Sequence, residues 1–182
     1  MSDRLVIRRL EELDFDRLHE MDLSEHITLI YRWADGQLKP EAHDGHRPRW
    51  DQAHWRERLT EWSTDLQPDV WIGAFVRERM AGLASLRYQL APRMAQLTTL
   101  HIDQAHRRKG LARQLVRTVA SMAEDRGADE LYVSATNSES AVGFYLSQGF
   151  LPAGTPNPRM FELEPEDIHM VRPLSPVRTL SV

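Results

Sequence analysis

The pattern of apolar and polar residues along the chain predicts a fold built around β-strands. An almost continuous apolar run, Val-Trp-Ile-Gly-Ala-Phe-Val, covers residues 70–76, and a charged turn at 77–79 separates it from a second segment at 80–90. Runs of this length, bounded by turn residues, are typical of buried strands that pair as a hairpin. Pro92 ends the second segment. Further strands are predicted at residues 4–8, 95–103, 130–135, 150–154 and 168–174.

Apolar residues spaced three and four positions apart predict helices between these strands. Residues 52–65 carry one such stripe, formed by Trp55, Leu59 and Trp62. Residues 111–126 carry another, formed by Leu111, Leu115, Val119 and Met122. A third helix is predicted from about Ser140 to Gln148. The glycines at 127 and 149 stand where helices commonly end.

Two N-terminal segments are less regular. An acidic segment beginning at about Asp14 has apolar residues near helical spacing, at Phe15, Leu18, Met21 and Leu23. Residues 35–51 contain glycine, proline and many charges without any periodicity, so the sequence predicts a loop there.

The order of these elements indicates the fold class. Antiparallel strands come first, and a strand–helix–strand unit follows them. We therefore expect an α/β (α+β) fold in which helices flank a mixed, mostly antiparallel central sheet. The length of 182 residues fits one domain, which we place at residues 1–174, followed by a short C-terminal tail at 175–182.

Composition narrows the range of functions. The formal net charge of −4 argues against a general nucleic-acid binder, which needs a basic surface to neutralise phosphates. The chain has no cysteine, and this excludes disulfides, thiolate metal sites and a cysteine nucleophile. The start resembles no signal peptide, and no run approaches the roughly 20 apolar residues that a membrane span needs. We expect a cytoplasmic protein that does not bind membranes.

The most informative stretch is residues 102–113, Ile-Asp-Gln-Ala-His-Arg-Arg-Lys-Gly-Leu-Ala-Arg, between a predicted strand and a predicted helix. A helix N-terminus has unpaired backbone N–H groups and a partial positive charge, and Gly110 would let a phosphate approach them. The alternative is an ordinary basic loop before an ordinary helix. The stretch matches neither G-x-x-x-x-G-K-[ST] nor G-x-G-x-x-G, so nucleotide hydrolysis and dinucleotide redox chemistry lose their main support.

A second motif, Phe144-Tyr145-x-x-x-Gly149-Phe150, follows the predicted helix and strand. Together with Arg-x-x-Gly-x-Ala at 107–112, it resembles the GNAT superfamily of N-acetyltransferases over about residues 95–151. The resemblance implies an enzyme that transfers an acetyl group from acetyl-CoA. Because the chain has no cysteine to form an enzyme thioester, the transfer would be direct.

The resemblance also assigns roles to residues. It implies that the pyrophosphate of acetyl-CoA binds the turn formed by Arg107, Arg108, Lys109, Gly110, Leu111 and Ala112. It implies that the main chain of Leu100, His101 and Ile102 pairs with the pantetheine arm and the thioester carbonyl. Tyr145 would be the general acid that protonates the leaving thiolate, because a phenol can donate a proton at neutral pH. The alternative for Tyr145 is a core residue, since most buried aromatic side chains only pack.

Two positions depart from the superfamily pattern. An asparagine that contacts pantetheine often lies seven residues before the tyrosine, whereas Asn137 lies eight residues before Tyr145. Asn137 is therefore either a cofactor contact or a helix cap or turn residue. The second departure is the general base: where some members have a glutamate, this chain has Tyr132. His101, Asp22, Glu25 and a chain of water molecules all stay open as bases.

The acceptor side rests on acidic and aromatic residues. Acids are frequent in residues 11–25, and the superfamily's first helix usually borders the acceptor. An acidic wall would suit a cationic amine, although a solvated helix face is the better explanation for the acids from Glu11 to Asp16. Acids before the last predicted strand would close the cleft from the opposite side. The acceptor candidates are Asp22, Glu25, His26, Tyr31 and Trp33, and the second acidic group is Glu162, Glu164, Glu166 and Asp167.

We therefore expect an acetyl-CoA-dependent N-acetyltransferase, a monomer or homodimer, that acetylates a primary amine of a small metabolite or antibiotic. A protein N-terminal or lysine acetyltransferase is the alternative, and a non-catalytic acyl-CoA-binding regulatory module is a third hypothesis. We expect no metal, because His43 and His46 lie in a predicted loop, with His54 further on, without cysteine and without the helical H-E-x-x-H spacing.

Overall fold

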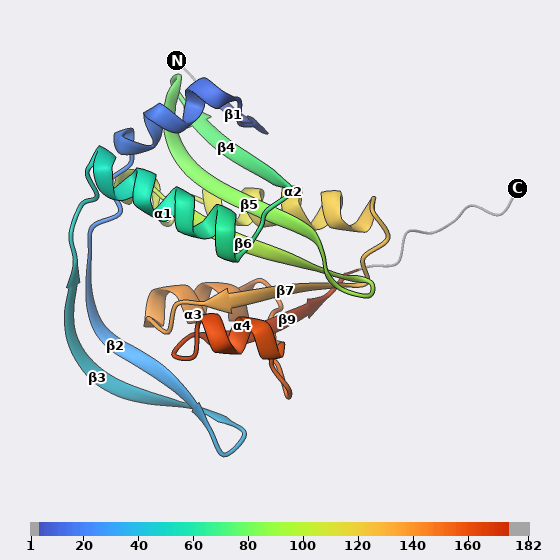
Figure 1. The fold of residues 1–182 in the computed structure, drawn as a ribbon. Helices are drawn as coiled ribbons and strands as arrows, with labels where there is room; N and C mark the ends of the chain where they lie inside the picture. The colour runs from blue at the N-terminus through green and yellow to red at the C-terminus, as the bar shows by residue number, and fades with distance from the viewer. Residues whose placement is uncertain (1–3, 175–182) are drawn as a thin grey trace, which may run out of the picture.

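A computed structural model describes residues 4–174 of the chain (Figure 1). Its main sheet has seven strands in the order β1-β4-β5-β6-β7-β9-β8, and β2 and β3 form a separate two-stranded sheet. The bounds of the strands are β1 Leu5–Arg9, β2 Glu25–Ala34, β3 Gln37–Arg47, β4 Val70–Val76, β5 Arg79–Ala91, β6 Met94–Ile102, β7 Glu130–Ala135, β8 Leu151–Pro152 and β9 Ile168–Pro173. All neighbours are antiparallel except β6 and β7, so the predicted mixed, mostly antiparallel sheet is confirmed.

The helices pack against both faces of this sheet and bury two separate cores. On one face α2 and α3 cover an aliphatic cluster that includes Leu115, Val119 and Leu131. On the other face α1 and a 3-10 helix, η1, cover an aromatic cluster that includes Trp55 and Trp62. The bounds of the helices are η1 Glu12–Glu20, α1 Gln52–Asp65, η2 Gln104–His106, α2 Leu111–Glu124, α3 Glu139–Ser147 and α4 Pro158–Leu163.

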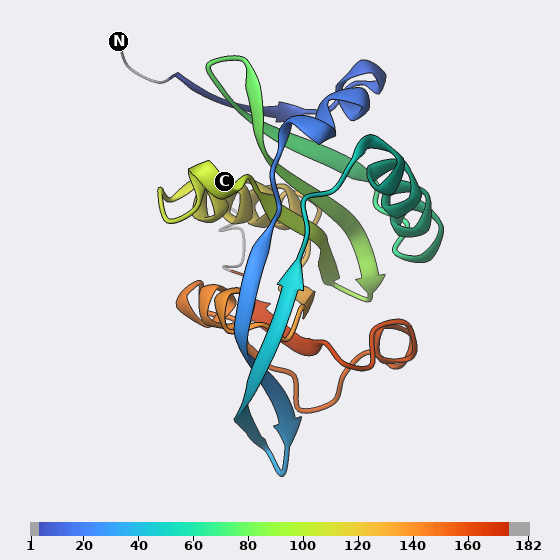
Figure 2. The same ribbon diagram turned by 90° about the vertical axis from the view of Figure 1, so that its left-hand side faces the viewer.

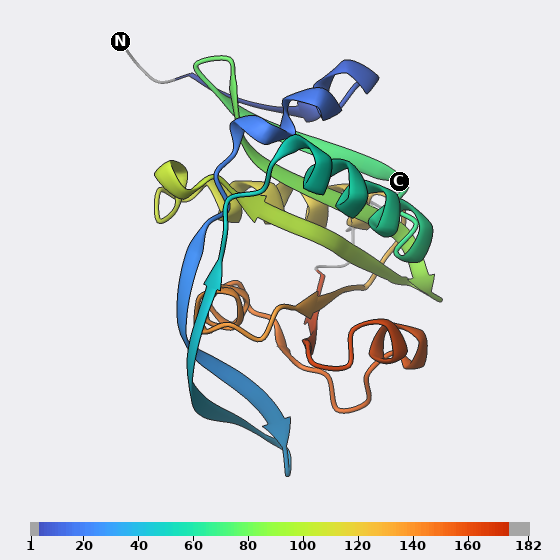
Figure 3. The same cartoon turned by 60° about the vertical axis from the view of Figure 1, so that its left-hand side comes forward.

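The single parallel contact of the sheet is short, and this shapes the molecule. Residues 94–96 of β6 pair with residues 130–132 of β7, and beyond Gln96 the two strands no longer pair. Strands β1, β4, β5 and β6 therefore form one half of the molecule, while β7, β9 and β8 form the other. Figures 1 and 3 show the two halves diverging from this contact, with α1 above and α3 and α4 below.

The predicted loop at 35–51 is wrong, because most of it belongs to a long β-hairpin. Asp35 and Gly36 form its turn, with φ of 54° and 71° as a type I′ turn requires. Most side chains of β3 are exposed, so the strand lacks the alternation by which strands are recognised. Figure 2 shows the hairpin running from one half of the sheet to the other.

The N-terminal acidic segment is helical as predicted, but it is a 3-10 helix that begins at Glu12 rather than at Asp14. Phe15, Leu18 and Met21 are spaced by three, which fits three residues per turn better than 3.6.

Other elements differ from prediction mainly in length. The strand predicted at 150–154 has two residues, Leu151 and Pro152. Helix α4 was not predicted; Asn157 caps it by accepting from the Met160 amide at 3.2 Å, and Pro158 is its first residue. The expected tail at 175–182 lies outside the described residues, and the single-domain assignment stays a prediction.

Candidate active site

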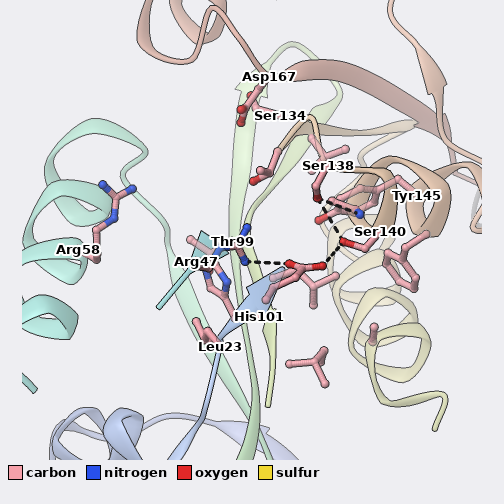
Figure 4. Close-up of a pocket in the computed structure, with 18 of the residues that line it drawn as sticks. Leu23, Arg47, Arg58, Thr99, His101, Ser134, Ser138, Ser140, Tyr145 and Asp167 are labelled. Carbon is pink, nitrogen blue, oxygen red and sulfur yellow. Dashed lines mark hydrogen bonds and ion pairs between the residues drawn. The ribbon is translucent and has the colours of Figure 1, made fainter. Parts of the chain in front are cut away.

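A cavity of about 1040 Å³ lies where β6 and β7 separate (Figure 4). Its size is at the upper end of the range for small-molecule sites. Every residue from Leu97 to Ile102 lines it, because this part of β6 pairs with β5 on one edge and with no strand on the other. An open strand edge offers backbone N–H and C=O groups to an extended ligand that carries amides of its own. The cavity can therefore hold a linear ligand along β6.

The turn between β6 and α2 closes one end of the cavity. Gly110 precedes the first residue of α2 and has φ of +80°, a conformation that strains any residue with a side chain. A Cβ atom at this glycine would have no heavy atom within 4 Å, so the backbone there is open to a ligand. Arg108 and Ala112 line the cavity. This arrangement is compatible with an anion site at the start of the helix, which stays a prediction.

Other members of the predicted turn lie differently. Arg107 lines the cavity, but its guanidinium donates to the Ile102 carbonyl at 3.3 Å and to the Ser24 carbonyl at 3.1 Å. It therefore also joins the turn to the start of the β2–β3 hairpin. Lys109 and Gly110 are exposed outside the cavity lining, and Leu111 is buried in the aliphatic core. Their roles in cofactor binding stay predictions.

Tyr145 on α3 lines the cavity and is also part of the core. Its ring packs edge-on against Phe144 and Phe150, with centroid distances of 5.3 Å in both cases. Burial raises the pKa of its phenol, and the nearby Asp167 adds to this. Its hydroxyl has no hydrogen-bond partner within residues 4–174. The ring is thus held rigidly, while its hydroxyl stays available to a ligand.

His101, one of the open candidates for a base, lies in an aromatic and cationic environment. It stacks on Trp62, with 5.0 Å between ring centroids, and lies edge-on to Trp50 and Trp55. Burial, followed by the charges of nearby arginines including Arg47, lowers its pKa to about 3. The imidazole is therefore neutral at physiological pH and too weak a base to take a proton from an ammonium group.

The two ends of the hairpin bring Glu25 and Arg47 into the cavity. The Glu25 carboxylate accepts from the Ser140 hydroxyl at 2.6 Å and lies 3.6 Å from the Arg47 guanidinium. His26 lines the rim and bonds Asp44 at 2.9 Å. The Glu25 contacts join the hairpin to the start of α3, and Figure 4 marks them with dashed lines at Arg47 and Ser140.

Several predicted site residues lie outside the cavity lining. Asp22 accepts from the Ser24 amide at 2.8 Å. The backbone of Tyr31 bonds the Asn137 carbonyl at 2.7 Å, and the Tyr31 ring packs on the aliphatic core. The cap of α3 is Ser138, so the interpretation of Asn137 as a helix cap is wrong. The other roles proposed for these residues stay predictions.

The acids before β9 border the cavity from the side opposite the hairpin ends. Glu164, Glu166 and Asp167 line it, whereas Glu162 does not. Burial, and then the charge of Glu164, raise the pKa of Asp167 to about 7. Burial also raises the pKa of Glu164, and a hydrogen bond from Ser134 opposes that shift. Two carboxyl groups of this wall, those of Glu164 and Asp167, therefore take up protons more readily than exposed acids do.

Comparison with known proteins places this site in a family. The model of the Acetyltransferase (GNAT) family matches residues 27–150, which is most of the chain. The chain belongs to the GNAT family. The resemblance carried by the two motifs is thereby confirmed, and the diverging strands are the part of this GNAT fold that forms the cavity.

Curated relatives match only part of the chain. Human N-acetyltransferase 8B is 41% identical over 66 residues, which is 36% of this chain and 29% of the relative. Streptothricin acetyltransferase from Streptomyces lavendulae is 32% identical over 76 residues, 41% of this chain and 40% of the relative. The matched region thus spans less than half the length of either relative.

Solved structures share the fold over nearly the whole chain. Nourseothricin acetyltransferase has a TM-score of 0.72 at 20% identity, covering 94% of this chain and 99% of that one. A putative streptothricin acetyltransferase from Bacillus anthracis, in complex with acetyl coenzyme A, has a TM-score of 0.69 at 18% identity, covering 96% and 98%. These similarities confirm the GNAT fold.

Some residues that line this GNAT cavity carry no signal in the sequence that would mark them as site residues. Arg47 ends the hairpin that was interpreted as a loop, and Arg58 lies on α1 outside the apolar stripe that identified the helix. Ser134, Ser138 and Ser140 line the opposite wall. Their polar side chains follow no pattern along the chain, and only the paired strands bring them together.

The described residues offer neither a metal site nor a membrane-spanning helix. In residues 4–174, no group of three or more His, Cys, Asp or Glu side chains is arranged to hold a metal ion. None of the helices in that range is long and apolar enough to cross a membrane.

Proposed function

We propose that the protein transfers the acetyl group of acetyl-CoA to a primary amine of a small molecule. The observation that carries this proposal is the cavity between β6 and β7. Its lining includes the open edge of β6, residues at the start of α2, and Tyr145, whose hydroxyl has no partner in residues 4–174. We call the part lined by residues 97–102, Arg107, Arg108 and Ala112 the donor half, and the part lined by Arg47, Arg58, Glu164, Glu166 and Asp167 the acceptor half.

The residues of the donor half fit acetyl-CoA. The backbone before α2 is open at Gly110, and Arg108 supplies a positive charge for the pyrophosphate. The exposed edge of β6 would pair with the amides of the pantetheine arm. Acetyl-CoA would supply an activated acyl group there as a thioester.

Tyr145 would act at the end of the donor half. Its raised pKa keeps the phenol protonated at neutral pH, so the hydroxyl donates a hydrogen bond to the thiolate as the C–S bond breaks. The packing of its ring on Phe144 and Phe150 fixes the direction of that donation. Core packing and acid catalysis are therefore compatible roles for this side chain.

The acceptor half favours a small cation. Three carboxyl groups line it, and the ion pair between Arg32 of β2 and Glu166, at 3.1 Å, joins the hairpin to the segment before β9. This link brings the hairpin next to the segment that carries the three carboxyl groups, and we expect such a site to suit a compact substrate better than a protein chain. Similarity to a streptothricin acetyltransferase supports a small-molecule acceptor.

Thiol release from acetyl-CoA, measured against a panel of small primary amines and of peptides with free N-termini or lysines, tests the proposal. We expect release with at least one small amine. Release with peptides alone would replace the proposal with a protein acetyltransferase. Tight acetyl-CoA binding without release for any amine would replace it with a non-catalytic binding module.

A further inference from the structure

An ammonium group must lose a proton before its nitrogen can attack a thioester, because an amine of pKa near 10 is only about one part in a thousand neutral at pH 7. The cavity must therefore supply an acceptor for that proton. The side chains of the lining that can accept one are Glu25, His26, His54, His101, Glu164, Glu166 and Asp167.

Most of these groups are poorly suited. His101 is neutral but too weakly basic, with a pKa of about 3. Glu25 is already paired with Arg47 and accepts a hydrogen bond from Ser140. Glu166 is largely exposed and paired with Arg32. His26 is likewise exposed and paired with Asp44, and His54 lies exposed near Glu57.

Asp167 differs from all of them in its surroundings. Its carboxylate forms no ion pair or hydrogen bond with another residue of the described chain. The next residue, Ile168, begins β9 and pairs with Ala135 of β7, so the backbone that carries Asp167 is fixed by the sheet. Figure 4 shows Asp167 at one end of the cavity, close to Ser134.

We propose that Asp167 is the catalytic residue that takes the proton from the acceptor's ammonium group, with Glu164 beside it as a positioning residue. The inference rests on the proposed acetyl transfer. It is supported by the cavity that these residues share, in which the charge of Glu164 acts on Asp167 and the charge of Asp167 acts on Tyr145.

The electrostatics of the pocket suit this role. A group with a pKa of about 7 is half deprotonated at neutral pH and remains basic enough to compete for a proton. The charged and titratable groups around it come from its own segment and from three other elements. They are Glu164 and Glu166 of its own segment, Arg32 of β2, Tyr145 of α3 and His169 of β9, while Arg58 and Asp65 of α1 act on the neighbouring Glu164.

Asp167 and Tyr145 together account for every proton that moves in the transfer. The ammonium nitrogen gives its first proton to the Asp167 carboxylate, which later releases it to solvent. The nitrogen lone pair forms a bond to the thioester carbonyl carbon, and the C–S bond breaks with its electron pair on sulfur. Tyr145 gives its proton to the sulfur and regains one from the nitrogen, so that an amide, a free thiol and one released proton result.

Asp167→Asn tests the role, with Glu162→Gln as the matched control because Glu162 is exposed outside the cavity lining. With the alkylamine that gives most thiol release in the panel, we expect kcat/KM at pH 7 to fall about a hundredfold in Asp167→Asn. Acetyl-CoA affinity, measured by calorimetry, should stay within twofold of wild type in both variants. In wild type, kcat/KM should level off above about pH 7, whereas in Asp167→Asn it should keep rising with the neutral fraction of the amine.

Hydroxylamine, which is mostly neutral at pH 7, separates a base from a structural residue. Asp167→Asn should use it nearly as well as wild type does, because no proton has to be removed first. Equal loss with hydroxylamine and with the alkylamine, or wild-type activity with the alkylamine, would overturn the role of Asp167. Failure of the proposed function is a different result, namely no thiol release by the wild-type protein with any amine.

Discussion

The donor and acceptor halves of the cavity are assembled from the chain in different ways. The donor half comes from a single stretch, in which β6 runs directly into the turn and α2. The acceptor half comes from the end of β3, from α1 and from the segment before β9, which lie far apart in sequence. The residues of the donor half are therefore recognisable as a local sequence motif. Those of the acceptor half come together only when the sheet has formed.

The largest effect should come from the donor half. Gly110→Glu forces a side chain onto a backbone with φ of +80° and adds a negative charge where a phosphate would bind. We expect acetyl-CoA affinity to fall at least about a hundredfold, since like charges brought together cost several kcal/mol.

Gly110→Asn is the control for this variant, because asparagine tolerates a positive φ and carries no charge. Isothermal calorimetry should show that it retains most of the affinity. Tight binding by Gly110→Glu would contradict the placement of the pyrophosphate at this turn.

Tyr145→Phe should separate chemistry from binding at the junction of the two halves. The ring still packs on Phe144 and Phe150, but the proton donor is gone. We expect kcat to fall about a hundredfold, with acetyl-CoA affinity and thermal stability close to wild type. Steady-state kinetics and calorimetry measure both, and unchanged kcat would exclude the tyrosine as the acid.

The contrast between local motifs and separate segments also explains which parts of the fold and site the sequence predicts. The motif at 107–112 and the tyrosine of α3 were visible because each lies within one element and its flanking turn. The β2–β3 hairpin was missed because solvent reaches both faces of β3, so no apolar alternation marks it. Helix α4 did leave a signal, an asparagine cap followed by proline, although six residues are too few to show helical periodicity.

The chemistry of the acceptor half was even less accessible from the sequence. Nothing in the chain distinguishes Asp167 from Glu162, since both are acids in one charged segment. Only burial beside Glu164 sets Asp167 apart. Likewise His101 has a suitable intrinsic pKa as a base, and only its packing against three tryptophans and the surrounding arginines removes that property.

The acceptor half should also lower the stability of the folded protein. The carboxyl group of Asp167 has a higher pKa in the folded state, about 7, than its ordinary value of 3.8. The folded protein therefore loses stability as the pH rises between these values, because ionisation is easier in the unfolded chain. We expect Asp167→Asn to raise Tm by a few degrees at pH 8 and to have little effect near pH 4.

Differential scanning fluorimetry at the two pH values measures this difference. Glu162→Gln serves again as the control and should leave Tm unchanged at both, because its carboxyl group is exposed. A lower Tm for Asp167→Asn at pH 8 would mean that the surroundings stabilise the carboxylate. The acceptor half would then not destabilise the folded protein as proposed.

The smallest effect should come from the link between the hairpin and the segment before β9. Arg32 bonds both Glu41 across the hairpin and Glu166, and all three side chains are at least half exposed. Exposed ion pairs contribute little and are screened by salt. Arg32→Gln should therefore raise the KM for the acceptor amine only about two- to threefold at low salt, without changing acetyl-CoA affinity.

The exposed pair of Arg93 with Asp129 lies outside the cavity, so Arg93→Gln is the control. If Arg32→Gln instead weakened acetyl-CoA binding, the two halves would not be separable, because the hairpin would then be holding the donor half as well.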